Sequence, residues 1–253
     1  VVLETADLSA IGRGKAAPLL GSALFETVLL KIRQHGEEGF VVVDIDCGDL
    51  AVVDRQVDRA CLDGCLVAAW PELAVSPETL ERIRAELRAR PLRRRPGRPP
   101  ALVAAGSHHE PSDAGYRNVA VVLDGFGETV LRYEKVNPYM NRKLGTEAIV
   151  PGTLLPVLVT DEALVAFAIC KDFCDEGPDI PLGCLDVDLI LVPSMGNDTT
   201  MRGHQANAKR HKLRYGSRTF VVQQHDQPAG EGTTTPRTYG YVLRPADDPE
   251  ALR

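Results

Sequence analysis

The hydrophobic positions along the chain fall mainly into short apolar runs. Each run is roughly 4 to 8 residues long, rich in β-branched residues and bounded by Gly, Pro, Asp or Asn, which favours strands over helices. The predicted strands are 40–46, 65–70, 101–106, 118–124, 128–135, 163–170, 187–194, 219–225 and 238–244. Several runs are apolar almost throughout, as expected where both faces of a sheet are covered.

Helical patterns separate some of these runs. Over residues 76–90, Ser76 can cap the first turn and Pro77 suits its first position, while leucine and isoleucine recur on one face. A second helix is predicted over 201–216, and a third over 21–35 near the start of the chain. Strands interspersed with helices predict a mixed, layered α/β domain.

Two connecting segments carry further signals. The runs 118–124 and 128–135 are joined by a segment containing Gly125 and Gly127, which predicts a β-hairpin. The segment 87–100 is of low complexity and dense in Arg and Pro. It could contact nucleic acid or an acidic partner, but its prolines and its position between a helix and a strand favour a solvated loop.

Composition and charge narrow the class of protein. With 253 residues, of which 44% are hydrophobic, the chain can bury one large core. A formal net charge of −6 argues against a nucleic-acid partner, whose phosphates require a basic surface. The sequence contains neither an apolar run of about 18 residues nor the pattern of a signal peptide, so we expect a cytoplasmic protein with no membrane partner.

The six cysteines are few for a chain of this length, and reduced thiols are the better interpretation. The pairs Cys61/Cys65 and Cys170/Cys174 leave a four-thiolate zinc site open as an alternative, although structural zinc usually draws on C-x2-C pairs in Gly-rich loops. Taken alone, a cysteine at the end of an apolar strand is more often a buried core residue than a nucleophile.

Three apolar runs lead into groups that can perform chemistry, namely Glu72, Lys135 and Cys170. Catalytic groups in layered α/β folds gather at strand ends, so we expect the three to meet in one cleft. A free thiol is mostly protonated at neutral pH, so Cys170 needs a base such as Glu72. Lys135 and the backbone N–H of Lys171 can stabilise the negative charge that grows when sulfur attacks a carbonyl or nitrile carbon.

The ordered motifs WPEL, RYEKV, AICKD and DLILVPS resemble those of the nitrilase or carbon–nitrogen hydrolase superfamily, as does the YRN motif that ends at Asn118. The resemblance covers residues 40–244 in outline. It implies a four-layer α-β-β-α sandwich over residues 40–253. Residues 1–39 do not resemble the family's opening strand, and the helical pattern within them predicts an N-terminal helical extension.

The same resemblance implies a role for each candidate residue. Glu72 matches the general base, Lys135 the stabiliser of the tetrahedral intermediate, and Cys170 the nucleophile. The family often has a second glutamate that assists in substrate positioning and proton handling. Glu147, shortly before Pro151, is the matching candidate.

Several positions leave alternatives open. Lys143 is a rival for the catalytic lysine but does not follow a predicted strand. Asn137 stands where the family commonly has histidine, and Lys171 stands where an aromatic or small polar residue is common. Lys171 could lower the pKa of the adjacent thiol or point into solvent. His108 and His109 could form a papain-like site with the cysteine, although no motif supports that pairing.

The function implied by the resemblance is hydrolysis of a non-peptide C–N bond, in the first place of a linear amide, through a thioester acyl-enzyme. A nitrile would use the same groups, and so would acyl transfer if an amine displaced water. The resemblance implies that no metal or organic cofactor is required and that the protein forms a homodimer or larger homo-oligomer. A further domain could be fused to this one. The alternative is a non-catalytic or regulatory module of a larger multidomain protein that senses a small acyl compound or mediates assembly.

Overall fold

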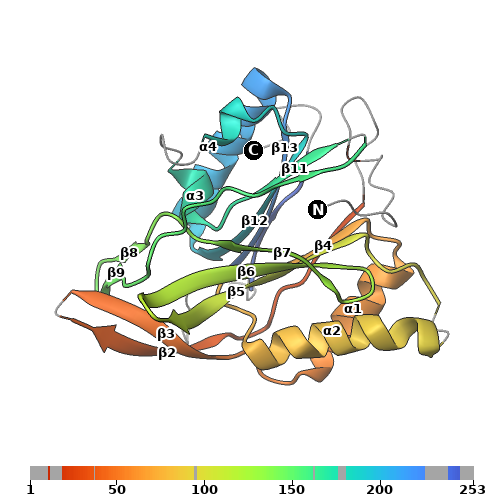
Figure 1. Ribbon diagram of the computed structural model, residues 1–253, viewed down its shortest axis with the longest axis horizontal. Helices are drawn as coiled ribbons and strands as arrows, with labels where there is room; N and C mark the ends of the chain where they lie inside the picture. Colours follow the sequence, from red (N-terminus) through yellow and green to blue (C-terminus); the bar gives the residue numbers. More distant parts are fainter. Residues whose placement is uncertain are drawn as a thin grey trace, which may run out of the picture.

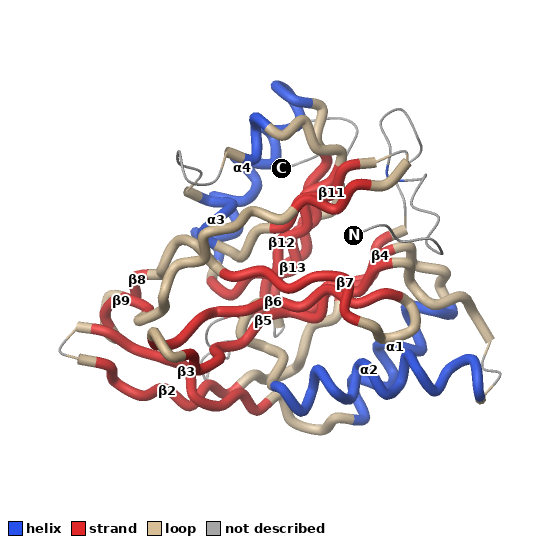
Figure 2. The backbone as a smooth tube through the Cα atoms, in the orientation of Figure 1, coloured by secondary structure: helices blue, strands red, loops and turns tan. Residues whose placement is uncertain are grey.

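The computed structural model describes residues 11, 19–36, 38–93, 96–161, 163–175, 181–225 and 239–245. Within these residues, two five-stranded sheets lie face to face, and helices cover the outer face of each sheet (Figures 1 and 2). The layers run helix, sheet, sheet, helix, which confirms the predicted four-layer α-β-β-α sandwich.

The strands within the described ranges form three sheets. The first sheet has the order β1 (Leu20–Ser22), β4 (Val67–Trp70), β5 (Leu102–Ser112), β6 (Gly115–Asp124) and β7 (Thr129–Glu134). The second has the order β10 (Val157–Val159), β11 (Leu164–Phe167), β12 (Leu189–Gly196), β13 (Arg218–His225) and β14 (Gly240–Leu243). A smaller sheet beside the sandwich has the order β2 (Leu29–His35), β3 (Gly39–Asp46), β9 (Gly145–Glu147) and β8 (Met140–Asn141) (Figure 1).

The helices divide between the two outer layers. They are α1 (Ala51–Leu62), α2 (Pro77–Leu92), α3 (Lys171–Cys174) and α4 (Asp198–Tyr215), with a short 3-10 turn, η2, at Leu182–Cys184. The first two pack on the first sheet, and the last two pack on the second. None of the helices in the described ranges has the length and apolar character needed to cross a membrane.

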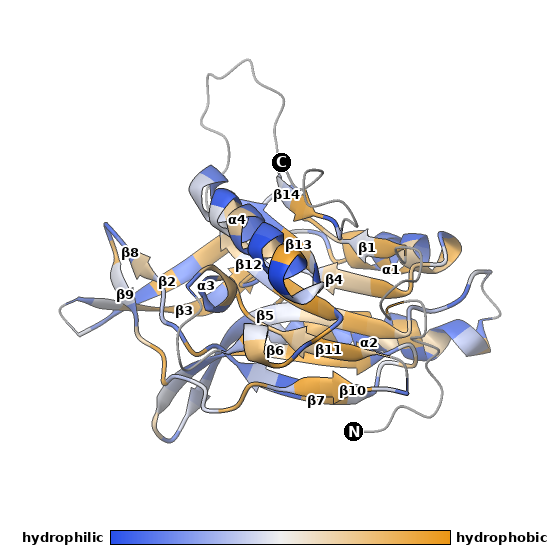
Figure 3. Ribbon diagram, turned by 90° about the horizontal axis from the view of Figure 1, so that it is seen from above, coloured by the Kyte–Doolittle hydropathy of each residue, from blue (hydrophilic) through white to orange (hydrophobic). Residues whose placement is uncertain are grey.

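The main core lies between the two five-stranded sheets. Side chains alternate along each strand, so Ala69 and Ala104 face the second sheet while Ala68 and Val103 face the helices. Figure 3 shows hydrophobic residues along the strands of both sheets and hydrophilic residues on the outer surface of α4. Burial on both faces explains why these strands are apolar almost throughout.

Most predicted elements are confirmed, with shifted ends. The hairpin is β6 and β7, and the helix predicted over 201–216 is α4. At the start of α2, the backbone N–H of Thr79 donates to Oγ of Ser76 at 3.1 Å, so the predicted cap is present. The strand predicted over 163–170 ends at Phe167, which leaves Cys170 in the turn that follows. Residue 238 of the last predicted strand lies outside the described residues.

The helix predicted over 21–35 is wrong. Residues 20–22 form β1, which pairs with β4, and residues 29–35 form β2, which pairs with β3. Pairing with strands distant in the sequence satisfies this backbone, so local helical periodicity does not decide its conformation. The extension over 1–39 is therefore not helical at 20–22 and 29–35, and the domain boundary at residue 39 stays a prediction. The helix α1 was not predicted.

The Arg/Pro segment 87–100 is less solvated than predicted. The helix α2 continues through Pro91 in its last turn. Arg90 is 3% exposed, and its guanidinium donates to Asp58 at 2.6 Å and to the carbonyl of Pro96. Residues 94–95 lie outside the described part of the chain. One arginine of this segment thus joins α2 to α1 rather than facing a partner.

Candidate active site

Four predicted site residues lie at strand ends from three different sheets. Glu72 follows β4, Lys135 follows β7, Glu147 ends β9 and Cys170 follows β11. Each of them is at most 3% exposed. The two carboxylates contact the ammonium directly, and the backbone of Met195 links the thiol to Glu72. The fold therefore brings the predicted groups together in one buried cluster.

Lys135 is held between two carboxylates. Its Nζ donates hydrogen bonds to Oε1 of Glu72 and to Oε2 of Glu147, both at 2.7 Å. Burial lowers the pKa of Lys135, but the negative charges of Glu147 and Glu72 outweigh burial and raise that pKa well above its ordinary value. The side chain is therefore a fixed cation within the site.

The carboxylate of Glu147 is surrounded by four donor groups. Besides the lysine, Oε2 accepts a hydrogen bond from the backbone N–H of Tyr139 at 2.9 Å. Oε1 accepts from Nδ2 of Asn118 at 2.9 Å and lies 2.8 Å from Nε2 of His109. Burial raises the pKa of this carboxyl, but Lys135 and the ring of His109 hold it below its usual range. Glu147 is thus kept ionised.

Glu72 faces both the lysine and the cysteine. Its Oε1 accepts hydrogen bonds from Lys135 and, at 3.0 Å, from Nδ2 of Asn118. Its Oε2 accepts from the backbone N–H of Met195 at 3.1 Å. The carbonyl oxygen of Met195 in turn accepts from Sγ of Cys170 at 3.5 Å. One backbone segment therefore places the Oε2 side of the carboxylate near the sulfur.

Cys170 occupies a backbone conformation that is rare for a side chain. Its φ of 46° and ψ of −102° lie in a region favoured by glycine. Its N–H donates to the carbonyl of Pro193 at 2.9 Å, and Lys171 begins α3, where N–H groups have no acceptor within the helix. Burial, and then Glu72, raise the pKa of the thiol well above its usual value, whereas Lys135 lowers it. The resting group is a thiol, so attack requires a base.

Asp172 fixes the turn that carries the cysteine, and it also contacts the segment that follows Lys135. Its carboxylate accepts hydrogen bonds from the backbone N–H of Ile169 at 3.4 Å and of Asn137 at 2.7 Å. Val136 donates to the same carboxylate. Burial raises the pKa of Asp172 to about 6 despite these hydrogen bonds. The residue after Lys135 is thereby tied to the turn at Cys170.

A cavity of about 200 Å³ opens beside this cluster. Glu72, Lys135 and Glu147 contribute its carboxylate and ammonium groups. The apolar part of its lining comes from Leu30, Ile32, Phe40, Leu73, Leu144 and Met195. The small sheet supplies the first three, so β2 and β3 form one wall of the cavity.

The rival side chains are exposed or have other partners than the thiol. Lys143 is exposed. The ammonium of Lys171 donates to the carbonyl of Pro138 at 3.2 Å, so it is engaged neither with the thiol nor solely with solvent. His108 lies 2.9 Å from Glu110, while His109 contacts Glu147. The two histidines are therefore committed to carboxylates.

The cysteine pairs considered as zinc ligands lie in different layers. Cys61 lies in α1 and Cys65 shortly after it, both packed against the first sheet, whereas Cys170 precedes α3 and Cys174 ends it, on the second sheet. Sγ of Cys174 lies 3.3 Å from Nδ1 of the buried His204. All six cysteines are free thiols. The sequence spacing therefore does not bring four thiols to one point.

Sequence reasoning missed the contributions of Met195 and Tyr139. Both act through backbone N–H groups, which no side-chain pattern reveals. Asn118 was recognised only as part of a motif, yet its amide donates to both Glu72 and Glu147 and is fully buried. A polar residue at the start of an otherwise apolar strand is the signal that could have identified it.

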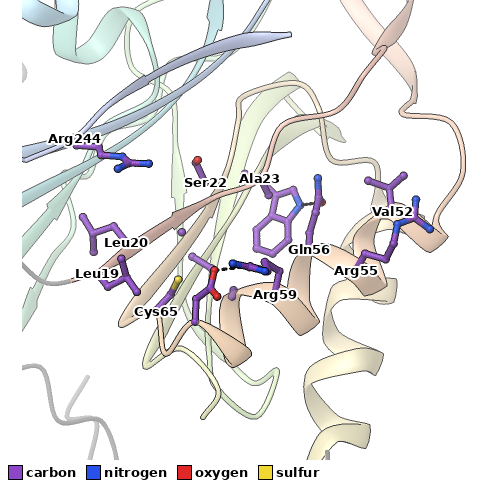
Figure 4. Close-up of a pocket in the computed structure, with 15 residues that line it drawn as sticks. Leu19, Leu20, Ser22, Ala23, Val52, Arg55, Gln56, Arg59, Cys65 and Arg244 are labelled. Atoms are coloured by element: carbon purple, nitrogen blue, oxygen red, sulfur yellow. Dashed lines mark hydrogen bonds and ion pairs between the residues drawn. The ribbon is translucent and has the colours of Figure 1, made fainter. Parts of the chain in front are cut away.

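A larger cavity, of about 400 Å³, lies at the edge of the first sheet between β1 and α1 (Figure 4). Nε1 of Trp70 donates to Oε1 of Gln56 at 2.9 Å on one side of it. Asp63, the acidic group among the described lining residues, is paired with Arg59 at 2.6 Å. Lys135 and both carboxylates line the smaller cavity, and Cys170 lies behind its lining residue Met195, so the smaller cavity is the candidate active site.

No protein-family model matches the chain, and no curated protein matches it. Solved structures do match. An amidase from Nesterenkonia sp. is 20% identical, with 94% of this chain and 87% of that chain covered and a TM-score of 0.57. A variant of the Nesterenkonia AN1 amidase from the nitrilase superfamily is 23% identical, with 79% and 78% covered and a TM-score of 0.54.

A third solved structure is a mutant of the amidase from Nesterenkonia sp. AN1 that shows Michael addition of acrylamide at the active-site cysteine. It is 24% identical, with 79% of this chain and 80% of that chain covered and a TM-score of 0.53. At these identities the similarity establishes that this chain shares the fold of these amidases.

Proposed function

We propose that this chain hydrolyses a small linear amide through a thioester on Cys170. The observation that carries the proposal is the buried contact of Lys135 with both Glu72 and Glu147, in a cluster that the backbone of Met195 joins to the thiol. The shared fold with amidases, one of which takes up acrylamide at a cysteine, supports it.

The first step forms a tetrahedral intermediate that is bonded to the sulfur of Cys170. Glu72 accepts the proton of the Cys170 thiol while sulfur attacks the amide carbonyl carbon, and the carbonyl π electrons move to oxygen. Because burial and Glu72 itself keep the thiol protonated at rest, proton transfer accompanies attack rather than preceding it. Lys135 and the backbone N–H of Lys171 donate to the developing oxyanion. A well-placed donor of this kind contributes about 3 to 4 kcal/mol.

The second step releases the amine and restores the enzyme. The protonated Glu72 gives its proton to the nitrogen while the oxyanion re-forms the carbonyl and the C–N bond breaks, so ammonia or an amine leaves and the thioester remains. Glu72 then takes a proton from water, which attacks the thioester carbon. The C–S bond breaks, the acid departs, and the sulfur recovers the proton from Glu72. The residues return to their starting protonation states, and no further reagent is consumed.

In this mechanism Glu147 stays ionised throughout and does not transfer a proton. Its oxygens already face Lys135, Tyr139, Asn118 and His109, and its pKa is held below the usual range. It keeps the lysine cationic and fixes its direction. This replaces the proton-handling part of the role implied by the family resemblance.

The proposal is tested with a panel of small amides and nitriles, by measuring ammonia release and by intact-mass detection of an acyl group on the protein. We expect ammonia release and a transient acyl adduct, both absent in Cys170→Ala. Cys184→Ala, which removes an exposed thiol, is the matched control and should behave as wild type. A new acyl product without hydrolysis would indicate acyl transfer.

Failure of every amide, nitrile and small electrophile to modify Cys170 would overturn the proposal and favour a binding or assembly module. A homo-oligomer, a fused domain and a cytoplasmic location remain predictions from the sequence.

A further inference from the structure

His109 lies between the cavity wall and the buried glutamate. Its Nδ1 accepts a hydrogen bond from the backbone N–H of Val42 at 2.9 Å, and its Nε2 lies 2.8 Å from Oε1 of Glu147. The side chains of His109 and Glu147 are 0% and 1% exposed. The ring therefore bridges β3 and β9 with no access to water.

The two partners fix the tautomer of the ring. The backbone N–H of Val42 can donate only to a ring nitrogen that carries a lone pair, so Nδ1 is unprotonated. The ionised carboxylate of Glu147 offers only acceptors, so Nε2 carries the hydrogen and donates it. The arrangement thus selects the neutral Nε2–H form of His109.

The ring of His109 replaces the next hydrogen bond of the backbone ladder between β3 and β9. Strands β3 and β9 pair in parallel at Gly39–Thr146 and Phe40–Glu147, and the N–H of Ala148 donates to the carbonyl of Phe40 at 2.8 Å. In a parallel ladder, the next bond would run from the N–H of Val42 to the carbonyl of Ala148. The N–H of Val42 donates to His109 instead, and the ring carries the connection to Glu147.

We propose that His109 is a positioning residue, held as the Nε2–H tautomer, that couples the cavity wall on β3 to Glu147 and thereby sets the direction of the Lys135 ammonium. The inference rests on the proposed function, because Lys135 acts there as the oxyanion donor. Phe40 lines the cavity two residues before Val42, so a shift of the wall would be passed to the carboxylate through the ring. His109 itself contacts no reacting atom in this scheme.

Two substitutions of His109 test its two hydrogen bonds separately. The amide of Gln can reach the position of Nε2 and donate to Glu147, whereas the shorter Asn can accept from Val42 but does not reach the carboxylate. We expect H109Q to keep kcat within a few-fold of wild type and H109N to lower kcat by roughly 10- to 100-fold with little change in KM. Each variant loses one buried hydrogen bond, so a purely structural role predicts equal effects on kcat.

The tautomer is read without any substrate, from the ¹⁵N NMR signals of the histidine rings in the folded protein at about pH 7. A proton on Nδ1 of His109 would overturn the inference. The alkylation rate of Cys170 by chloroacetamide gives a second readout that needs no turnover, and we expect H109N to change it and H109Q to preserve it. His108→Gln is the control, since that ring pairs with Glu110.

These outcomes distinguish the two proposals. Equal alkylation and equal kcat in H109Q and H109N would refute positioning by His109 while leaving amide hydrolysis intact. Failure of the amide panel would refute the hydrolase proposal, and the tautomer and the alkylation rates would still decide the role of His109.

Discussion

The ammonium of Lys135 lies 2.7 Å from Oε1 of Glu72, and both residues are at most 2% exposed. Replacing Lys135 with Met leaves Glu72 and Glu147 buried without their counter-charge. We expect Lys135→Met to abolish turnover and to lower the free energy of unfolding by about 3 to 5 kcal/mol, measured by urea denaturation. Adding Glu147→Gln should recover part of the stability but no turnover.

Comparing Lys135→Met with the double variant that also carries Glu147→Gln separates the effect of charge on stability from the effect of packing. Both contain methionine in place of the lysine, so they differ only in one carboxylate. If Glu147→Gln destabilised Lys135→Met further, the buried negative charge would not be the cause of the loss.

The positive φ of Cys170 predicts an unusual order of stability among its variants. Alanine keeps the strain of φ 46°, whereas glycine adopts this conformation freely. We expect Cys170→Gly to be more stable than Cys170→Ala by about 1 kcal/mol in urea denaturation, the reverse of the order at ordinary positions. Both should be inactive. A higher stability for the alanine variant would mean that this bend is not strained.

His204 should make the fold sensitive to acid. Burial lowers the pKa of His204 from 6.5 to about 3, so between these values the unfolded chain binds a proton that the folded chain does not. Its contribution to stability is fully present above the unfolded pKa and is lost as pH falls towards 3. We expect His204→Gln to reduce the slope of unfolding free energy against pH by up to about 1.4 kcal/mol per pH unit.

The matched control for this slope is His35→Gln, which removes an exposed histidine and should leave the slope unchanged. Slopes are compared rather than absolute stabilities, because His204 also contacts Ser194 and Cys174. An unaltered slope in His204→Gln would contradict the assignment of a buried neutral ring.

The cavity wall on β2 should limit the size of the acyl group. Leu30 lines the cavity and is half-buried, whereas the adjacent Leu29 is 56% exposed and is not part of the lining. We expect Leu30→Phe to lower kcat/KM for butyramide relative to acetamide by about 10-fold, since a methylene group in an apolar pocket is discriminated by this amount. Leu29→Phe should leave the ratio unchanged. Equal effects of the two variants would place the acyl group elsewhere.

The sequence identifies the strand-end residues of the site because their positions follow from local patterns. Glu72, Lys135 and Cys170 come directly after apolar runs, and strand ends on one side of a sandwich converge. The contact of His109 with Glu147 follows instead from the pairing of β3 with β9 and the course of β5, which link residues far apart in the chain. No local pattern encodes that register.

The parts of the fold that the sequence analysis predicted wrongly or missed have similar physical causes. Residues 29–35 are almost entirely exposed, so their burial pattern has no period to read, and pairing with β3 decides their conformation. In α1, Val53, Val57, Ala60 and Cys61 are buried at helical spacing, but charged residues interrupt the short segment. Arg90 belongs to a basic stretch, and its burial is explained by its contacts with Asp58 on α1 and the carbonyl of Pro96, which no local pattern reveals.

The small sheet of β2, β3, β9 and β8 stands outside the core between the two large sheets. If the proposed function holds, exchanging β2 and β3 should alter the substrate range while the sandwich serves as a constant scaffold. The exchange has one constraint: a graft must still present a main-chain donor to His109 at position 42 of β3, or the transplanted wall will disturb the chemistry it was meant to retarget.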